Sequence, residues 1–377
     1  MLSCRELSRC PGRVWRVDAV PGQLQAAERG QLSLPLESGT RPPGGTGPTQ
    51  FKAGSRVLQV SECFDTYWRF AAERQRVFHC RAAGVLPPWT ADPILRQHKF
   101  TSVYRAADRV SQYLIANVIY AGPQDPCEVL FRVLLFKVFN RIDTWERLTS
   151  SLDAMPSWAG YDFRVYSKVF DQALRAGKRI YSPAYIVPNP PFGEARKHGN
   201  HLRLIELAMT RLPEAVTTAR GLRGLYDLLA GLPSLGPFLA YQYAIDISYS
   251  TITAADENEF VVPGPGALDG IAKCFTSTGG LDPAEVITWM RDTAAEHLNR
   301  LSLEFKDLWG RWPTLIDWQN VFCEVSKYTR LSHPHIPGTS GRTKIKQQFH
   351  QAPGAVDYRF PPKWGLPPDR TAVLRDS

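Results

Sequence analysis

Two short segments of this sequence, residues 125–128 and 282–285, each combine three signals that start an α-helix. Both read Asp-Pro-x-Glu: Asp can cap free backbone N–H groups, Pro is tolerated at the first helical position, and Glu suits the third. From residue 61 to residue 83, aromatic and other apolar residues recur at helical spacing. Strand signals are few and short, and the best of them are residues 185–187 and 261–262. The chain is therefore predicted to be all-α.

The same patterns predict how the chain is organised. Further helices are expected over residues 161–176, 198–219, 222–229 and 314–330, and the proline-rich stretch 181–192 is expected to be a loop. We expect three regions: a disordered Gly/Pro/Arg-rich tail over residues 1–55, a helical domain over 56–330, and an extended basic segment over 331–377. Any boundary between two lobes of the helical domain is expected near 178–197.

Composition limits the classes of protein to which this chain can belong. It has 377 residues, 44% of them hydrophobic, and a formal net charge of +9, which together fit a sizeable core and a polyanionic partner. The longest apolar run contains charged residues, so no membrane-spanning helix is expected, and the N-terminus has no signal-peptide pattern. Seven dispersed cysteines without Cys-x-x-Cys spacing favour an intracellular protein, in the cytoplasm or nucleoid, or in the nucleus of a eukaryote. No metal and no cofactor are predicted.

The segment 231–240 is typical of the end of one helix, a tight turn and the start of a second helix. Backbone N–H groups at such a turn can bind a DNA phosphate, and glycine lets the backbone approach it closely. Ser234 and Gly236 are therefore predicted to contact DNA, as are Gly264 and Gly266 of the Pro-Gly-Pro-Gly turn that follows. The alternative is an ordinary connection between two helices.

The spacing of this segment resembles that of the helix-hairpin-helix DNA glycosylases. It reads Leu-Pro-x-x-Gly-x-x-x-Ala, and Asp256 follows sixteen residues after the final Ala. The resemblance implies that the hairpin binds a DNA phosphate and that Asp256 lies in a base pocket. Ser234 stands where that superfamily has a second glycine. Phe238 stands where bifunctional members have a nucleophilic Lys, so no Schiff-base lyase reaction is expected.

Three carboxylates lie close together in the sequence, at Asp256, Glu257 and Glu259. Their mutual repulsion is expected to raise the pKa of at least one of them. In a base pocket such a group could stabilise positive charge as a glycosidic bond breaks, or take a proton from an attacking water or amine. These three residues are the predicted catalytic residues. The alternative is a solvated acidic loop beside the Pro-Gly turn.

A dense polar motif occupies residues 99–112. Four of its side chains lie three or four residues apart, so on a helix they would share one face. Arg and Gln side chains there could hold DNA phosphate or the edge of an extruded base, and Tyr104 could stack on that base. The predicted DNA- or base-binding residues of this region are Lys99, Tyr104, Arg105, Asp108, Arg109, Gln112 and Asn140. The alternative for Arg105, Asp108 and Arg109 is an internal salt-bridge network that holds two lobes together.

Two further segments, together with this motif, indicate one protein family. They are Phe-Lys-Val-Phe-Asn at 136–140 and Glu-Phe-Val-Val-Pro-Gly-Pro-Gly-Ala at 259–267. The sequence resembles the helical domain of the 5-hydroxymethyluracil (5-hmdU) DNA kinases, a domain similar to the alpha-glutamyl/putrescinyl thymine pyrophosphorylases. The resemblance covers about residues 56–367. It implies a DNA glycosylase-like helical fold and a role in thymine hypermodification, in which a hydroxymethyl group on uracil is phosphorylated and then replaced by an amine or an amino acid.

One departure from that family concerns ATP. Its kinases carry a separate P-loop domain, whereas the nearest string here, residues 338–344, has the wrong spacing for a P-loop. The predicted function is therefore to bind DNA, extrude a modified pyrimidine and act on it by base substitution or transfer. Two alternatives stay open: a non-catalytic DNA-binding module that partners a separate P-loop kinase or another modification enzyme, and a monofunctional glycosylase that excises a modified base. No membrane partner is expected.

Overall fold

The computed structural model of the chain describes residues 49–350 and 357–367. Contacts divide the chain into two units, residues 1–41 and 42–377, and all described residues belong to the second. The predicted tail lies outside the described residues over 1–48. Its last part is not a tail, because residues 50–53 form a β-strand.

The described residues form fourteen α-helices and three short β-strands, which confirms the all-α prediction. The helices are α1 (Glu62–Ala82), α2 (Pro93–Gln97), α3 (Arg109–Leu114), α4 (Pro126–Phe139), α5 (Ile142–Leu152), α6 (Phe163–Arg175), α7 (Lys197–Arg211), α8 (Pro213–Thr218), α9 (Gly221–Ala230), α10 (Pro237–Ser248), α11 (Pro265–Cys274), α12 (Pro283–Asp292), α13 (Ala294–Arg300) and α14 (Leu315–Ser332). Three short turns of 3-10 or π type are η1 (Arg105–Ala107), η2 (Ile115–Ile119) and η3 (Pro362–Trp364). Strands β1 (Gln50–Ala53), β2 (Arg56–Val60) and β3 (Phe275–Ser277) form one antiparallel sheet in that order. None of the described helices combines the length and apolarity needed to cross a membrane.

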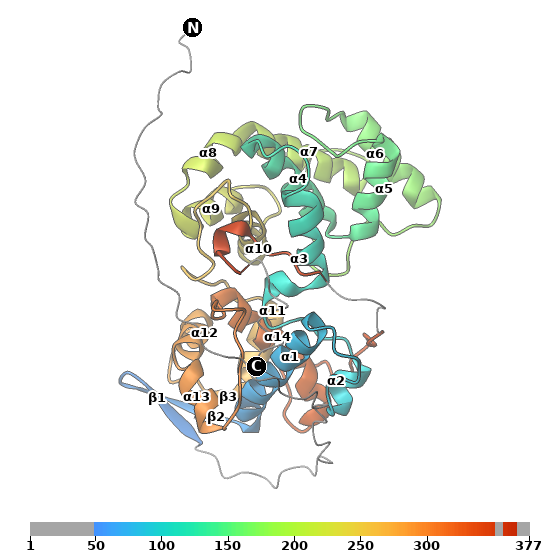
Figure 1. Cartoon of the computed structure of the whole chain (residues 1–377). Helices are drawn as coiled ribbons and strands as arrows, with labels where there is room; N and C mark the ends of the chain where they lie inside the picture. Colours follow the sequence, from blue (N-terminus) through green and yellow to red (C-terminus); the bar gives the residue numbers. More distant parts are fainter. Residues whose placement is uncertain (1–48, 351–356, 368–377) are drawn as a thin grey trace, which may run out of the picture. The chain divides into compact units, whose positions relative to one another are not determined.

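The helices fall into two groups, which Figure 1 shows one above the other. In the first group, α11, α1 and α12 all pack against α14. In the second group, α10 packs against α9 and α4, and α4 packs against α7. The second group comes from the middle of the sequence, so the chain leaves the first group after α2 and returns to it at α11.

Polar caps fix the helix starts that the sequence predicted. Asp125 accepts hydrogen bonds from the N–H groups of Cys127 and Glu128 at the start of α4. Asp282 and Glu285 form a reciprocal capping box at the start of α12. Ser61 caps α1. Each such cap contributes about 1 kcal/mol to helix stability, so these boundaries follow from local chemistry.

Aromatic rings fill the core of the first group. Trp68 on α1 stacks on His297 at 5.2 Å between ring centroids and meets Trp318 on α14 edge-on at 5.5 Å. Phe64 meets the same histidine at 5.0 Å. Burial lowers the pKa of His297 to about 4, so this imidazole packs as a neutral ring at neutral pH.

Neither of the two short strand signals forms a strand, and residues 181–192 form a loop as expected. Residues 185–187 and 261–262 lie in loops, and the ladder forms between β1 and β2 instead, around a turn in which Gly54 has φ 58°. Pro188 and Pro263 directly follow the two segments with strand signals, and proline cannot donate a ladder hydrogen bond. The helix expected over residues 198–219 is divided into α7 and α8, because Pro213 cannot continue α7.

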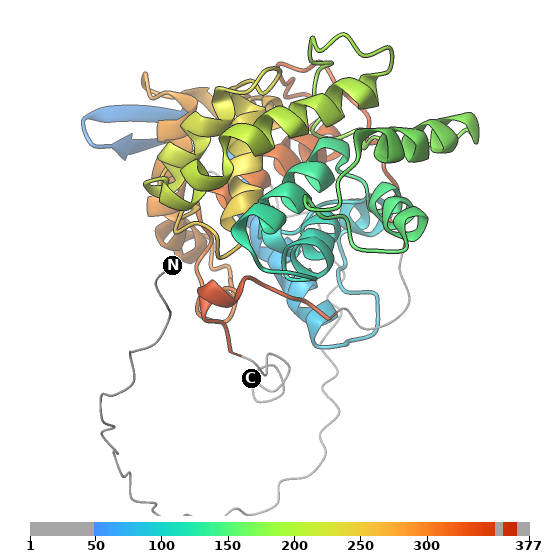
Figure 2. The ribbon, with the colours of Figure 1, turned by 90° about the horizontal axis from the view of Figure 1, so that it is seen from above.

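Part of the C-terminal segment is buried rather than extended over the surface. We call residues 357–367 the C-terminal strap. Tyr358 and Phe360 of this strap are buried, and Trp364 lies in η3. Gln112 on α3 accepts a hydrogen bond from the N–H of Arg359 and donates one to its carbonyl oxygen, and both views show the strap passing beside α3 (Figures 1 and 2). The strap is therefore attached to the helices by backbone hydrogen bonds and by aromatic packing.

Candidate functional site

The predicted hairpin lies between α9 and α10, which pack against each other. Ser234 adopts φ 66°, in the left-handed region that favours glycine. Gly236 is exposed and is the N-cap of α10 at φ −66°, and a Cβ atom added there would meet nothing within 4 Å. The first N–H groups of an α-helix have no partner within the helix. The turn therefore presents the N-terminus of a twelve-residue helix to solvent.

Two further predicted glycines serve close packing. A Cβ atom on Gly264 would lie 2.3 Å from the ring of Phe238, and one on Gly266 would lie 3.0 Å from the sulfur of Cys323. Phe238 in turn stacks on Tyr185 at 6.0 Å between ring centroids. These glycines allow α11 to approach α10 and α14 closely, and their predicted contact with DNA stays a prediction.

A buried ionic cluster contains Asp246 of α10, the helix that begins at the hairpin, together with Arg105 and Lys137. The Asp246 carboxylate on α10 is 2.7 Å from an Arg105 guanidinium nitrogen and 2.5 Å from the Lys137 Nζ on α4. The ring of Tyr185 covers Lys137, with Nζ 4.1 Å from the ring centroid. Burial lowers the pKa of Lys137 to about 8, although Asp246 opposes that shift. Burial alone would raise the pKa of Asp246, but its two cationic partners outweigh it and lower that pKa.

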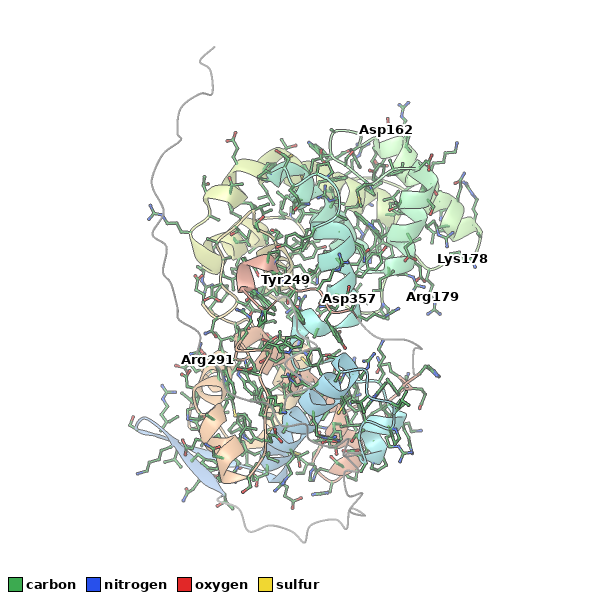
Figure 3. All side chains as sticks on the ribbon, in the orientation of Figure 1. Asp162, Lys178, Arg179, Tyr249, Arg291 and Asp357 are labelled. Carbon is green, nitrogen blue, oxygen red and sulfur yellow. The ribbon has the colours of Figure 1, made fainter. Side chains whose placement is uncertain are left out.

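Arg105 also connects the two groups of helices. Its backbone N–H donates to Asp317 on α14 at 2.8 Å. Its guanidinium donates to Gln242 on α10 and to the hydroxyl of Tyr249, which is labelled in Figure 3, at 3.1 Å each. The predicted alternative of an internal network thus describes Arg105, with Asp246 as its anion instead of Asp108.

A second buried ion pair joins Glu257 to Arg311. The guanidinium of Arg311 lies 2.5 Å from the Glu257 carboxylate, and only 2% of Glu257 is exposed. Burial raises the pKa of Glu257 to about 7, although Arg311 opposes that shift. Trp364 of the C-terminal strap lies over Arg311, with 4.0 Å between the guanidinium carbon and the ring centroid. The strap therefore covers the arginine side of this pair.

The three predicted catalytic carboxylates do not converge. Asp256 is exposed and accepts a hydrogen bond from the N–H of Asn258. Glu259 accepts hydrogen bonds from the first N–H groups of α9, those of Leu222 and Arg223, so it caps that helix. Only Glu257 is buried. The expected rise in a carboxylate pKa is confirmed for Glu257, but its main cause is burial, and repulsion from Asp256 is the smallest contribution.

The residues 105–112 do not share one helical face, so that expectation was wrong. Asp108 has an extended backbone at φ −76° and ψ 147°, and it separates the turn η1 from α3. As a result Arg105 points into the core, while Arg109 is exposed. Burial raises the pKa of Asp108, with Glu324 as the second cause.

The other predicted members of this region occupy varied positions. Lys99 is exposed. Tyr104 is 1% exposed, and its hydroxyl donates to the carbonyl oxygen of Arg311 at 2.6 Å, so its ring presents no face to solvent. Gln112 holds the strap, and Asn140 ends α4 in the left-handed conformation at φ 48°. Binding of DNA by these residues stays a prediction.

Sequence reasoning missed two residues of the buried ionic cluster. Lys137 is the one charged residue within the apolar run 133–139, and Asp246 is the only charged residue of α10. A charge inside an apolar helix is a signal for a buried ion pair, because an unpaired buried charge is strongly unfavourable. Neither residue carried a predicted role, since the pairing links positions far apart in the sequence.

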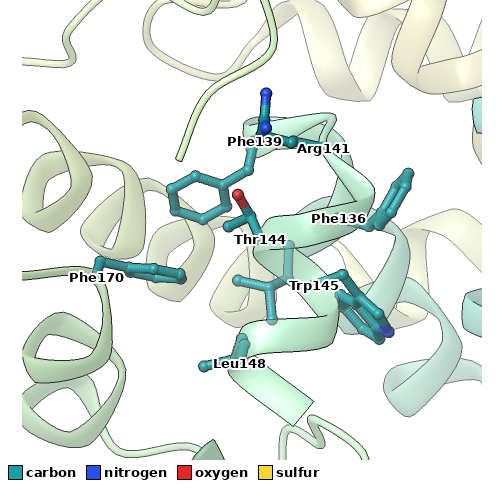
Figure 4. Close-up of a pocket in the computed structure, with 8 residues that line it drawn as sticks. Phe136, Phe139, Arg141, Thr144, Trp145, Leu148 and Phe170 are labelled. Carbon is teal, nitrogen blue, oxygen red and sulfur yellow. The ribbon is translucent and has the colours of Figure 1, made fainter. Parts of the chain in front are cut away.

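Two cavities lie near α5. Figure 4 shows the first, an apolar void of about 10 Å³ whose lining includes Phe139, Trp145 and Phe170. The second is an open depression of about 420 Å³ lined by Asp143, Glu146, Arg147, Ser150 and Ser151. The first holds at most one water molecule, and neither is lined by a predicted catalytic carboxylate.

Comparison with known proteins identifies related sequences. The profile of a family described as "5-hmdU DNA kinase, helical domain" matches residues 61–338. The 5-hmdU DNA kinase of Bacillus phage SP10 is 26% identical over 298 residues, which cover 70% of this chain and 44% of that protein. The match thus spans less than half the length of this curated relative. No solved structure matches the chain.

Proposed function

The chain belongs to the 5-hmdU DNA kinase helical domain family, and from that membership we propose that it is a DNA-binding module of a system that modifies 5-hydroxymethyluracil in DNA. The observation that carries the proposal is the exposed hairpin between α9 and α10. It combines a left-handed Ser234, an N-capping Gly236 without a side chain, and the N-terminus of a long helix. Backbone N–H groups and the helix dipole at such a terminus bind phosphate.

The charge of the chain supports a DNA partner, and two arginines lie near the N-terminus of α9, the end of this helix opposite the hairpin. Arg223 on this helix is exposed. Arg291 donates to the side-chain oxygen of Asn258 at 3.1 Å, so a second arginine borders the turn that caps α9 (Figure 3). The formal net charge of the chain is +9. An excess of cationic side chains strengthens non-specific binding to DNA and makes it sensitive to salt.

The test changes the hairpin without changing its fold. In Gly236→Asp, the new Cβ atom has open space and the backbone φ of −66° suits any residue. Asp is also a good N-cap, so the helix should be as stable as before. Its carboxylate should repel a phosphate and weaken duplex binding by roughly tenfold at low salt. The matched control is Gly236→Asn, which has the same shape and capping ability without the charge.

Binding would be measured by fluorescence anisotropy with labelled duplexes that contain thymine or 5-hydroxymethyluracil. We expect Gly236→Asn to bind like the natural protein and the affinity of both proteins to fall as salt rises. Equal affinity of the Asp and Asn variants would contradict a phosphate contact at the hairpin. Tighter binding to the modified duplex would support recognition of the base itself.

A second candidate function is chemistry on an extruded modified pyrimidine, by base substitution or by excision. The observation that favours it is Glu257, a buried carboxyl group whose pKa of about 7 suits an acid–base catalyst at neutral pH. For this role the strap residues over Arg311 would have to move aside to admit a base. Glu257→Gln should then abolish turnover, whereas the exposed neighbour in Asp256→Asn should be dispensable.

Mass spectrometry of nucleosides and free bases decides between these chemistries. The protein would be incubated with DNA that contains 5-hydroxymethyluracil or its phosphorylated form, with and without an added amine. A free base would indicate excision, and a new adduct on an intact strand would indicate substitution. Unchanged DNA, together with salt-sensitive binding, would support the non-catalytic module.

We assign phosphorylation of the base to a P-loop kinase domain outside these 377 residues. They lack the P-loop motif, and the matched part of the phage relative is less than half of that protein. The protein with ATP alone should therefore leave the mass of 5-hydroxymethyluracil DNA unchanged. Addition of 80 mass units per modified base, the mass of a phosphoryl group (roughly that of HPO₃), would contradict this assignment.

A further inference from the structure

Three side chains from two distant parts of the sequence meet where α1 begins and α14 ends. Glu62 lies in the first turn of α1, His333 is the C-cap of α14, and His335 follows two residues later. The Glu62 carboxylate oxygen is 3.4 Å from Nδ1 of His333 and 3.4 Å from Nε2 of His335. All three ligand atoms lie within 4.8 Å of one another. This group belongs to neither the hairpin nor the buried ion pairs.

We propose that Glu62, His333 and His335 form a three-ligand site for Zn²⁺. Zinc binds imidazole nitrogen and carboxylate oxygen at about 2.0–2.2 Å, so the ligands of a tetrahedral site are about 3.4 Å apart. The two Glu62–histidine distances already have that value. Two imidazoles and one carboxylate favour a transition metal over Mg²⁺ or Ca²⁺ and leave the fourth position for water.

Thr66 orients the first histidine. Its hydroxyl oxygen is 2.7 Å from Nε2 of His333, and the same hydroxyl donates to the carbonyl oxygen of Glu62 at 3.3 Å. A hydroxyl has one proton, so Thr66 accepts from an Nε2–H group. This tautomer places the lone pair of His333 on Nδ1, the atom that faces Glu62. A hydrogen bond to the second imidazole nitrogen is the usual support of a metal-binding histidine.

The backbone holds both histidines in place. The N–H of His333 donates to the carbonyl oxygen of Thr329, and the N–H of Ile336 donates to that of His333, at 3.0 Å each. Pro334 between the histidines restricts the turn further. Little ordering is therefore needed when an ion binds.

The Glu62 carboxylate and the end of α14 favour a cation, while the N-terminus of α1 opposes it with a partial positive charge. The C-terminus of α14 carries the negative end of its helix dipole. The side chains of Glu62 and His335 are 70% and 59% exposed, so an ion can reach them from solution. A bound ion would connect the first turn of α1 to the end of α14, two helices that already pack against each other. Binding should therefore also raise the melting temperature.

The experiment uses the full chain, stripped with a chelator and kept reduced. Calorimetric titration with ZnCl₂ should give one tight site, and His335→Ala or Glu62→Gln should weaken it by more than about 100-fold. The controls are His350→Ala and Glu296→Gln, which change exposed residues of the same types elsewhere. Thr66→Val should weaken binding by about 10- to 100-fold through loss of orientation.

Cobalt distinguishes this site from cysteine ligands, because five described cysteines are free thiols. Co²⁺ at the proposed site should give a visible d–d spectrum without a thiolate charge-transfer band, and His335→Ala should abolish that spectrum. Equal Zn²⁺ affinity in the natural protein, His335→Ala and Glu62→Gln would overturn the proposal. So would a thiolate band, or no Zn²⁺ binding at all, in which case the histidines only form ion pairs with Glu62 when protonated.

Discussion

Asp246 is the residue on which the charge balance of the second helix group depends. It is fully enclosed by protein and is the anion for both Arg105 and Lys137. Burying charges is unfavourable, and a buried pair is worth little compared with apolar residues of the same shape. Removing one partner is different, because the remaining charges are then buried without compensation. The cluster therefore makes Asp246 far less tolerant of change than an exposed aspartate.

We expect Asp246→Asn to destabilise the protein by about 3–5 kcal/mol, because two buried cations lose their anion. Urea unfolding followed by circular dichroism measures this change. Lys137→Met in the Asn background should recover part of the loss, since it removes one of the two cations. Asp143→Asn is the control, because Asp143 forms an exposed pair with Arg141 and should matter by less than about 0.5 kcal/mol. A small loss of stability in Asp246→Asn would contradict the inference that Asp246 neutralises two buried cations.

Glu257 predicts a dependence of stability on pH. Its pKa is raised from 4.5 to about 7 in the folded protein, so the folded state holds its proton more tightly than the unfolded state. The protonated form therefore contributes stability that is complete below pH 4.5 and is lost as the pH rises through about 7. The total is on the order of 3 kcal/mol.

Glu257→Gln removes this titration. The difference in free energy of unfolding between the natural protein and the variant should shift in favour of the variant as the pH rises from 5 to 8. Denaturant unfolding at several pH values measures it. A difference that is the same at every pH would show that the pKa of Glu257 is not raised.

At the scale of single helices and strands, the sequence predicts the boundaries that are determined by residues close together in the chain. The helix starts at Asp125 and Asp282 were predicted from their caps, because a cap and the turn that it serves are neighbours in the chain. The start near Ser61 was predicted from the spacing of apolar residues. The β1–β2 hairpin was missed, because its strands are short and lie beside a Gly/Pro-rich stretch. The prediction that side chains of residues 105–112 share one helical face was also wrong. It assumed that these residues form a single helix, whereas the extended backbone of Asp108 interrupts the helical conformation.

The hairpin turn gives a prediction at this scale. Ser234 has φ 66°, which costs a residue with a Cβ atom about 1–2 kcal/mol relative to the right-handed region. Ser234→Gly should therefore stabilise the protein by up to about 1 kcal/mol, after the greater flexibility of glycine in the unfolded chain is subtracted. Thermal unfolding measures the change, and DNA affinity should be retained.

The control for this variant is expected to change the stability of the protein in the opposite direction. Ser150 is exposed within α5, so Ser150→Gly should destabilise the protein by about 0.5–1 kcal/mol. A destabilising effect at Ser234 as well would mean that the turn does not adopt the left-handed conformation.

At the scale of the whole described unit, the contacts that matter join parts distant in the sequence. Arg105 connects α10 to α14, and Arg311 pairs with Glu257 across 54 positions. The sequence indicated that Arg105 and Glu257 were unusual, but it could not indicate their partners. That is why the sequence could name three candidate carboxylates but could not show that only Glu257 among them is buried. The family resemblance, in contrast, rests on motifs that are local, and the matched profile supports it.

The last prediction concerns the C-terminal strap, which crosses both groups of helices. Phe360 is 5% exposed, and its ring centroid lies 6.0 Å from that of Trp309 and 5.8 Å from that of Trp364. If the strap folds as part of the core, Phe360→Ala should destabilise the whole protein by about 3–5 kcal/mol, as for other buried aromatic side chains. Urea unfolding should still show one transition of unchanged slope.

Arg359→Ala is the matched control for this variant. The side chain of Arg359 is exposed and pairs with Asp357, while its backbone bonds to Gln112 do not depend on the side chain. We therefore expect its stability to change by less than about 0.5 kcal/mol. If Phe360→Ala leaves global unfolding unchanged and only makes the strap sensitive to protease, the strap opens independently of the core. Arg311 and Glu257 would then be accessible in the open state, and that result would strengthen the case for chemistry at Glu257.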